Sequence, residues 1–194
     1  WKWKKAKKFM FYIAEWLRKL WLVEDFRINK ISEDSKVYKL EVQITKKSSW
    51  VDIADVWFGV SQILPILVQS FYAERGSIII LEQPEIHLHP RVQSILADVF
   101  IEASKDRGIQ FIIESHSEHL LRRMQLRIAE EKINFNFIKT YFCKSVWGKS
   151  VIENLETDKY GNIINWPDNF FGDDVKEMED FLLAQINTKK NEKS

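Results

Sequence analysis

The strongest constraint on the fold lies in residues 77–119, where two short apolar runs each lead into a polar cluster. The first run, residues 78–81, lies between Gly76 and Pro84, and a short apolar run with such boundaries predicts a strand that is buried on both faces. The second run, residues 109–113, predicts another strand of the same kind. The two strands therefore define the centre of the expected fold.

The residues between the two strands have the spacing of a helix. Their apolar positions recur every three or four residues, at Val92, Ile95, Leu96, Val99, Phe100 and Ala103. Pro90 suits the first position of this helix, and Gly108 suits its end. A strand, a helix and a strand joined at this length form a βαβ unit, whose strands are parallel. Both polar clusters are thus expected at the carboxyl edge of the sheet, where open α/β sheets bind ligands.

The clusters at this edge are rich in carboxylates and imidazoles. They contain all four histidines of the chain among the candidate side chains Glu82, Gln83, Glu85, His87, His89, His116 and His119. The parallel topology brings the two groups together although they are far apart in the sequence.

Three interpretations of this cluster remain open on the residues alone. In the first, Glu82 holds Mg²⁺ on nucleotide phosphates, Gln83 orients the attacking water and His116 contacts the γ-phosphate. In the second, the His87-x-His89 pair, a later histidine and a carboxylate form the zinc or iron site of a metal-dependent hydrolase. In the third, the acids and histidines cap helices and satisfy backbone groups.

Composition narrows the setting. The 194 residues suffice for one domain with a hydrophobic core, and a formal net charge of +1 gives no global electrostatic case for a nucleic-acid-binding protein. The single cysteine, Cys143, excludes an internal disulfide framework and favours a reducing, cytoplasmic compartment. No apolar run is long enough to span a bilayer. The chain starts at Trp1 rather than at a methionine, so we expect a piece of a longer polypeptide.

Before the βαβ unit the sequence predicts a helix, a hairpin and a second helix. The first helix covers residues 1–23, with one apolar face formed by Phe9, Met10, Ile13, Trp16, Leu17, Leu20 and Trp21. Residues 26–44 predict the hairpin. Ser61 is a candidate N-cap of the second helix, with Pro65 in its first turn. Gly59 either lets backbone N–H groups approach an anion or forms a plain turn before that helix.

After the βαβ unit, residues 135–142 and 150–155 predict two paired strands. Between them, residues 148–150 resemble the end of a phosphate-binding P-loop, but Cys143 stands where that motif needs its first glycine, and no helix is expected to follow. We therefore predict a hairpin turn there. An amphipathic helix is expected over residues 173–186, with Val175, Met178, Phe181, Leu182 and Ile186 facing inward.

These motifs resemble a known family. Residues 81–90, LEQPEIHLHP, and residues 112–117, IIESHS, look like the Walker B, D-loop and switch-histidine segments of ABC-type ATPases, in the SMC-like and OLD-like group of AAA family ATPases. Residues 59–62, GVSQ, are similar to the signature loop of that group. The segment from residue 160 to residue 171 resembles a small C-terminal domain of unknown function that is attached to one branch.

The resemblance implies catalytic roles for four positions. Glu82 falls where the group has its magnesium-associated acid, and His116 falls on the switch histidine. Gln83 falls where most members have a catalytic glutamate. Because an amide cannot act as a general base, the resemblance implies slow hydrolysis or a contribution from another acid such as Glu85.

The resemblance also implies that the head works as a homodimer. The D-loop, which lies across the dimer interface in this superfamily, matches His87, Leu88 and His89. The signature segment, which would reach the γ-phosphate bound by the other subunit, matches Gly59, Ser61 and Gln62.

The implied fold is α/β, the C-terminal half of an ABC-type P-loop NTPase core with a mainly parallel sheet, flanking helices and a small antiparallel appendage. Its expected parts are residues 1–49, the ATPase lobe at 50–140 and the appendage at 141–194. The implied function is binding of ATP with Mg²⁺ and its slow hydrolysis, and the alternative is a regulatory module that dimerises on ATP without hydrolysing it.

The sequence contains no Walker A motif, so this segment alone is expected to be inactive as an ATPase. In the family that motif lies in an N-terminal lobe. An effector nuclease or DNA is a possible partner of regions outside these residues, and no membrane partner is expected.

Overall fold

The computed structural model describes residues 2–56, 58–167 and 181–185, and the chain divides into two compact units. The first unit is Trp1–Met124 and the second is Gln125–Ser194. Each unit has buried apolar side chains of its own, so each is described by itself.

The first helix, α1 (Lys2–Lys19), is shorter than predicted. Its inward side places several apolar side chains in the core, among them Ile13, Trp16, Leu17 and Leu20. The prediction that the helix reaches residue 23 with Trp21 facing inward is wrong. Trp21 adopts a φ of 61°, a left-handed conformation that ends a helix, and its side chain is 71% exposed. The guanidinium of Arg91 lies over its ring, 3.9 Å from the centroid.

The predicted hairpin is confirmed. Strands β1 (Asp25–Lys30) and β2 (Tyr38–Gln43) pair antiparallel. A third strand, β3 (Trp50–Asp52), pairs with the other edge of β2. The sequence pattern did not indicate β3, because three residues are too few to show alternation. A single 3₁₀ turn, η1 (Ile53–Asp55), follows and is capped by the side chain of Asp52.

The second helix, α2 (Phe58–Tyr72), begins earlier than predicted. Ser61 therefore lies inside the helix rather than at its N-cap, and Pro65 occupies an interior position rather than the first turn, so both predictions are wrong. Gly59 is part of the helix and is buried, and a Cβ on it would lie 3.4 Å from Cδ2 of Leu88. The glycine thus permits close packing against the loop after β4 and does not form a flexible turn.

The predicted βαβ unit is confirmed. Strand β4 (Ile78–Glu82) and strand β5 (Gln110–Glu114) pair in parallel, and α3 (Pro90–Arg107) connects them. His89 is the N-cap of α3, and Pro90 takes the first helical position, where its missing N–H costs nothing. Gly108 ends the helix with a φ of 67°, in the left-handed conformation that glycine adopts without strain.

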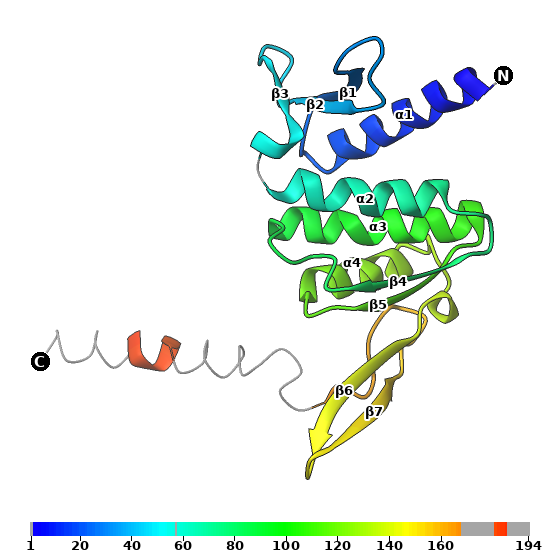
Figure 1. Ribbon diagram of the computed structural model, residues 1–194. Coiled ribbons are helices and arrows are strands. Elements are labelled where there is room, and N and C mark those ends of the chain that lie inside the picture. The colour runs from blue at the N-terminus through cyan, green and yellow to red at the C-terminus, as the bar shows by residue number, and fades with distance from the viewer. Residues whose placement is uncertain (1, 57, 168–180, 186–194) are drawn as a thin grey trace, which may run out of the picture. The chain divides into compact units, whose positions relative to one another are not determined.

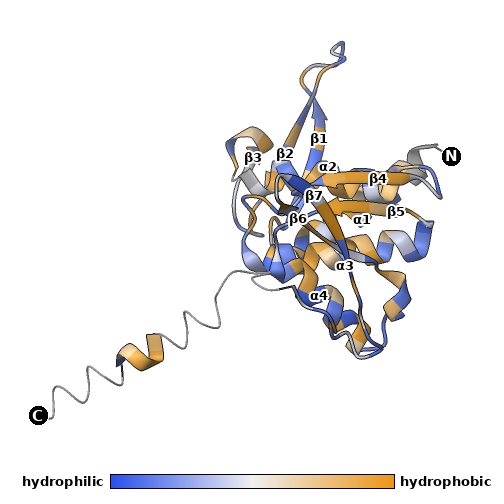
Figure 2. Cartoon of the chain, turned by 90° about the horizontal axis from the view of Figure 1, so that it is seen from below, coloured by the Kyte–Doolittle hydropathy of each residue, from blue (hydrophilic) through white to orange (hydrophobic). Residues whose placement is uncertain are grey.

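The strands β4 and β5 are covered on one face only. Helix α3 packs against β5 and α2, and α2 packs in turn against α1 (Figure 1). The other face exposes Ile78 by 60%, Ile80 by 69% and Ile112 by 52%. Both strands are nevertheless largely hydrophobic before their terminal glutamates (Figure 2). The prediction of burial on both faces is therefore wrong for the described residues, because nothing in them covers the second face.

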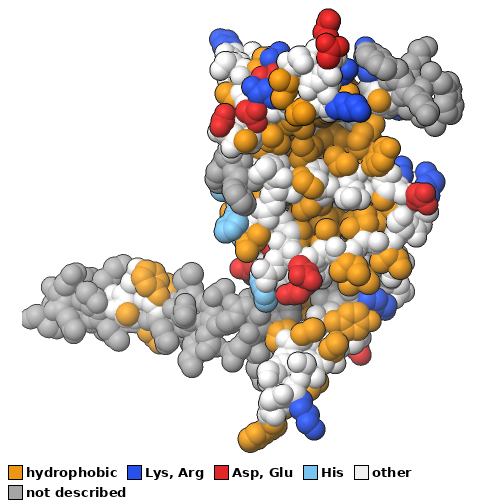
Figure 3. All heavy atoms as spheres, in the orientation of Figure 1, with side chains coloured by type: hydrophobic (Ala, Val, Ile, Leu, Met, Phe, Trp, Pro, Cys, Tyr) orange, Lys and Arg blue, Asp and Glu red, His pale blue; other side chains and the backbone are white. Residues whose placement is uncertain are grey.

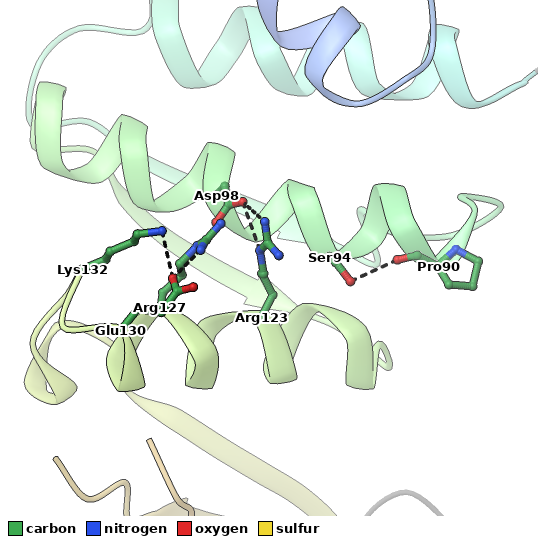
Figure 4. Close-up of polar contacts among 7 residues, drawn as sticks. All are labelled: Pro90, Ser94, Asp98, Arg123, Arg127, Glu130 and Lys132. Carbon is green, nitrogen blue, oxygen red and sulfur yellow. Dashed lines mark hydrogen bonds and ion pairs between the residues drawn. The ribbon is translucent and has the colours of Figure 1, made fainter. Parts of the chain in front are cut away.

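The last helix of the unit is tied to α3 by an ion pair. Helix α4 (Glu118–Ala129) continues across the boundary between the two units. Nε and Nη2 of Arg123 donate to Oδ2 of Asp98 on α3, at 3.1 and 2.8 Å (Figure 4). Both side chains are partly buried, so the pair helps to hold the middle of α4 against α3.

The second unit is built on the predicted hairpin. Strands β6 (Thr140–Val146) and β7 (Lys149–Leu155) pair antiparallel across a two-residue turn, Trp147-Gly148, in which both residues have positive φ. The hairpin turn predicted in place of a P-loop is therefore confirmed. The prediction that the first strand starts at residue 135 is wrong, because Phe135–Phe137 forms a 3₁₀ turn capped by the side chain of Asn134.

Most of the helix predicted over residues 173–186 lies outside the described residues, including Val175, Met178 and Ile186. Residues 181–185 are helical, but Phe181 and Leu182 are exposed rather than inward. In the parts of the chain that are described, no helix is long and apolar enough to cross a bilayer.

Candidate functional site

A cavity of about 540 Å³ lies at the carboxyl ends of β4 and β5. Its walls come from α2, from β4 and the loop after it, and from the end of β5, and are formed by Gln62, Ile66, Leu81, Glu82, Gln83, Pro84, Ile86 and Glu114. Figure 3 shows hydrophobic side chains gathered over the two strands, with acidic side chains and a histidine beside them. The cavity is therefore apolar on one side and acidic at its rim.

Two carboxylates form the acidic part of the cavity. Glu82 and Glu114 are directly opposite each other in the parallel ladder, and both side chains are exposed. Paired residues of parallel strands point to the same face, so both carboxylates lie on the face that carries the exposed isoleucines. Oxygen ligands and a local negative charge suit a hard divalent cation such as Mg²⁺. Sequence reasoning assigned no role to Glu114, although equal strand lengths in the βαβ unit would have placed it beside Glu82.

Gln83 is held at the rim by the backbone. Its N–H donates to the carbonyl of Glu114 at 2.8 Å, which extends the ladder one residue beyond β4. Its φ is 44°, a conformation that costs a side chain of this kind about 1 kcal/mol. The left-handed backbone turns the chain away from the sheet at this point, and the Gln83 side chain lines the cavity.

The loop after Gln83 contains two consecutive turns. The N–H of Ile86 donates to the carbonyl of Gln83, and the N–H of Leu88 donates to the carbonyl of Glu85, each at 3.1 Å. His87 has a positive φ of 60°. Leu88 is buried, whereas His87 is exposed. The three predicted D-loop positions, His87, Leu88 and His89, thus lie on one short loop in which only the middle side chain belongs to the core.

Glu85 belongs to this loop, but its side chain points into the protein and is not part of the cavity wall. Its side chain is only 6% exposed. Oε1 accepts a hydrogen bond from the backbone N–H of His116 at 2.8 Å. Oε2 is buried and has no hydrogen-bond partner among the described residues. The carboxylate therefore joins the loop after β4 to the loop after β5.

The side chain of Gln93 connects the same two loops. Nε2 of Gln93 on α3 donates to the carbonyl of Leu88 at 2.9 Å. Its Oε1 accepts from the hydroxyl of Ser117 at 2.6 Å. That hydroxyl in turn accepts from the N–H of Leu120 at 3.1 Å, which caps the first turn of α4. The sequence pattern did not indicate this role of Gln93, because a polar residue inside a helix most often faces solvent.

The four histidines occupy different environments. His116 is exposed and lies two residues beyond Glu114. Nδ1 of His89 accepts from the N–H of Arg91 at 3.2 Å, so this histidine caps α3, as the structural interpretation of the cluster expected. His119 is partly buried in the first turn of α4. Among the residues described, no three His, Cys, Asp or Glu side chains come together as a set that could hold a metal ion. The donors of the zinc or iron interpretation are therefore not assembled there.

The predicted signature residues begin α2. Gln62 lines the cavity, Ser61 is exposed one residue before it, and Gly59 is buried against Leu88. Of the predicted site residues, the structure therefore brings Gln62, Glu82 and Gln83 into one cavity wall. Gly59 and Ser61 lie in the first turn of α2, and the others lie on the loops after β4 and β5.

The family follows from a comparison of the whole chain with family models. Residues 3–121 match the AAA ATPase domain, and residues 133–181 match a protein of unknown function, DUF3696. The first match covers more than half of the chain, so the chain belongs to this AAA ATPase domain family. The membership makes this an ATPase-type domain and implies nucleotide binding. Among curated protein sequences, none matches the chain significantly.

Solved structures show the same fold. One comes from work on ATP-driven dimerisation and DNA-stimulated activation of SMC ATPases; it aligns with a TM-score of 0.58 at 17% identity and covers 79% of this chain and 86% of that one. An SmcHead bound to the C-winged helix domain of ScpA aligns at 0.59 and 16% identity, covering 78% and 43%.

A third is an Smc head domain with an extended coiled coil, bound to the C-terminal domain of ScpA and derived from Pyrococcus furiosus; it aligns at 0.58 and 15% identity, covering 78% and 35%. At these identities the likeness establishes the fold alone. The α/β fold predicted from the sequence is thus confirmed as that of SMC ATPase heads.

Proposed function

We propose that this chain is the part of a dimerising ABC-type ATPase head that carries the Walker B, D-loop and switch-histidine segments, and that the intact protein binds ATP with Mg²⁺ and hydrolyses it slowly. One observation carries the proposal. The parallel register of β4 and β5 brings Glu82, Gln83 and the loop that bears His116 to one edge of the sheet, beside a cavity. Membership of the AAA ATPase domain family supports the same function.

Each residue has a distinct task in this proposal. Glu82 holds the magnesium ion, directly or through water, and its carboxylate oxygens are the ligands that this ion prefers. Bound Mg²⁺ supplies positive charge to the phosphates. Gln83 orients water through its amide, and His116 donates a hydrogen bond toward the γ-phosphate as negative charge develops. The amide of Gln83 cannot take up a proton from water, so hydrolysis is slow.

The exposed face of β4 and β5 carries several large apolar side chains. Ile78, Ile80 and Ile112 form an apolar surface that a monomeric domain rarely leaves open. We propose that an N-terminal lobe with the Walker A motif covers this face and anchors the phosphates. In that division residues 1–49 end a larger domain, residues 50–140 are the C-terminal ATPase lobe, and residues 141–194 are an appendage.

Two heads are proposed to close on the nucleotide. Ser61, next to Gly59 and Gln62 at the start of α2, then reaches the γ-phosphate held by the other head, and the exposed imidazoles of His87 and His89 lie at the interface. A cytoplasmic location, with an effector nuclease or DNA contacting other parts of the protein, completes the proposal.

A second candidate function is an ATP-dependent dimerisation module that does not hydrolyse the nucleotide. The observation that favours it is the amide at Gln83, which lines the cavity where a catalytic acid is expected. Single-turnover hydrolysis by the intact protein distinguishes the two candidates. Conversion of bound ATP within one binding lifetime supports the ATPase, and release of intact ATP supports the module.

The test of the proposed function uses the intact protein that contains the Walker A lobe. The Glu82→Ala variant is expected to lower ATP turnover by about 100-fold or more, because the magnesium ion loses its carboxylate. The matched control is Glu74→Ala, which removes an exposed carboxylate just before the amino end of β4 and should leave turnover unchanged. Equal turnover of the Glu82→Ala variant and the wild type would remove the proposal.

A further inference from the structure

Two buried or partly buried side chains connect the loop after β4 with the loop after β5. Glu85 accepts from the N–H of His116 at 2.8 Å, and Gln93 joins the carbonyl of Leu88 to the hydroxyl of Ser117 at 2.9 and 2.6 Å. Neither Glu85 nor Gln93 is part of the cavity wall. Their contacts join two loops that lie about thirty residues apart in the sequence. The first loop begins at Gln83, and the second carries His116.

Glu85 is badly placed to act as a base. It is 6% exposed, so water and substrate do not reach it without a rearrangement of the loop. Neither carboxylate oxygen faces solvent, because Oε1 accepts from the His116 N–H and Oε2 is buried. Glu85 therefore serves as a hydrogen-bond acceptor for the backbone N–H of His116.

We propose that Glu85 is a positioning residue that fixes the backbone of His116 relative to the Gln83 turn, with Gln93 as a second tie, so that the two loops keep one spacing around the phosphates. The expected effect on turnover rests on the proposed function of the cavity. The hydrogen bond between Glu85 and the His116 amide does not depend on that function. From the sequence, Glu85 is a candidate acid that could contribute to hydrolysis. The proposal instead assigns it to holding the backbone of His116 in place.

The geometry explains why the tie needs an acceptor and not a charge. The carbonyl oxygen of a glutamine can take the place of Oε1 and accept from the same N–H, while its amide nitrogen takes the place of Oε2. An alanine removes the acceptor and leaves the His116 amide without its partner, which costs more than the bond itself contributes. Glu85→Gln and Glu85→Ala therefore separate positioning from acid–base chemistry.

The first measurement is steady-state turnover of the intact protein. Glu85→Gln is expected to keep kcat within about twofold of the wild type and to keep its pH profile. Glu85→Ala is expected to lower kcat by about tenfold or more, because the buried N–H of His116 loses its acceptor, with a smaller change in KM. A glutamine variant that loses about as much as the alanine variant, or that loses the acid limb of the pH profile, overturns the proposal. This outcome is readable even if the alanine variant does not fold.

The second measurement does not depend on ATP. Hydrogen–deuterium exchange at the His116 amide of the intact protein is expected to rise about tenfold or more in Glu85→Ala and to stay unchanged in Glu85→Gln. Unchanged exchange in the alanine variant overturns the tie. If the wild type has no ATPase activity but shows this exchange pattern, the proposed function fails and the tie stands, so the two failures are distinguishable.

Discussion

Two places where the chain leaves a strand use the same backbone conformation but are held by different forces. In the loop after β4, Gln83 and His87 have positive φ, and in the hairpin of the second unit Trp147 does. The hairpin turn is closed by the neighbouring strands alone, and Trp147 is 98% exposed. The loop after β4 is held by Glu85, whose side chain is bound to a residue thirty-one positions away.

The difference shows which kind of turn can be specified by the residues within it. A two-residue turn with glycine in its second position matches the twist of the paired strands, so the hairpin is specified by the residues within it. The loop after β4 contains no glycine, and its shape depends on partners in α3 and beyond β5. A turn that is strained and supported from a distance is typical of functional sites.

The comparison is tested most strongly at Gln83. In the intact protein, Gln83→Glu is expected to raise ATP turnover by about tenfold or more, because a carboxylate at this position can accept a proton from the attacking water. The control is Gln69→Glu, which adds the same charge on the exposed side of α2 and should have no effect. Steady-state phosphate release measures both. A Gln83→Glu variant no faster than the control would show that this turn does not present the attacking water.

The local character of the second unit is tested with two glycines. A Cβ at Gly161, where φ is 86°, would lie 2.4 Å from the backbone oxygen of Gln125, whereas a Cβ at Gly148, where φ is 74°, would meet nothing within 4 Å. Gly161→Ala is expected to cost the second unit about 3 kcal/mol of unfolding free energy, and Gly148→Ala about 1 kcal/mol.

Native-state hydrogen exchange of the β6 and β7 amides measures both losses within the same unit. Equal losses in the two variants would mean that strain alone decides stability here and that contact with Gln125 contributes nothing.

The smallest expected effect is on the turn at Asp158. The side-chain amide of Asn162, and backbone N–H groups that include that of Tyr160, hold the pKa of the Asp158 carboxyl below its usual range. A depressed folded-state pKa contributes stability above the pKa of the unfolded chain, and that stability is lost as pH falls below about 4 through the folded value.

The amide signals of Tyr160 and Asn162, followed by NMR from neutral to acidic pH, should shift together at the titration of Asp158. The Asp158→Asn variant keeps an acceptor and removes the titration, so its signals should stay constant. The same shift in both proteins would assign the effect to another group.

The βαβ unit could be predicted from the sequence because each of its signals is local. The apolar run at 78–81, the spacing of the α3 residues, Pro90 and Gly108 each specify one feature, and chain topology then makes the strands parallel. Burial of β4 and β5 could not be predicted in the same way, because it depends on which segments cover the sheet. The start of α2 was also missed, because burial of Gly59 against Leu88 is a tertiary contact.

The candidate site was predicted in part. The positions of Glu82 and Gln83 at the rim follow from the end of the strand, and both residues line the same cavity. The roles of Glu114 and Gln93, and the burial of Glu85, depend on pairing register and on side-chain contacts between distant segments. No periodicity within the chain reports such contacts, so they emerge only from the folded structure.

The most direct measurement is ATP turnover of the intact protein with His116 replaced by alanine. His116→Ala is expected to lower turnover by about 100-fold, the loss typical of one hydrogen-bond donor to developing charge, while His119→Ala on the neighbouring turn of α4 should remain close to the wild type. Equal turnover of the two variants would contradict the claim that the loops after β4 and β5 act together on one phosphate.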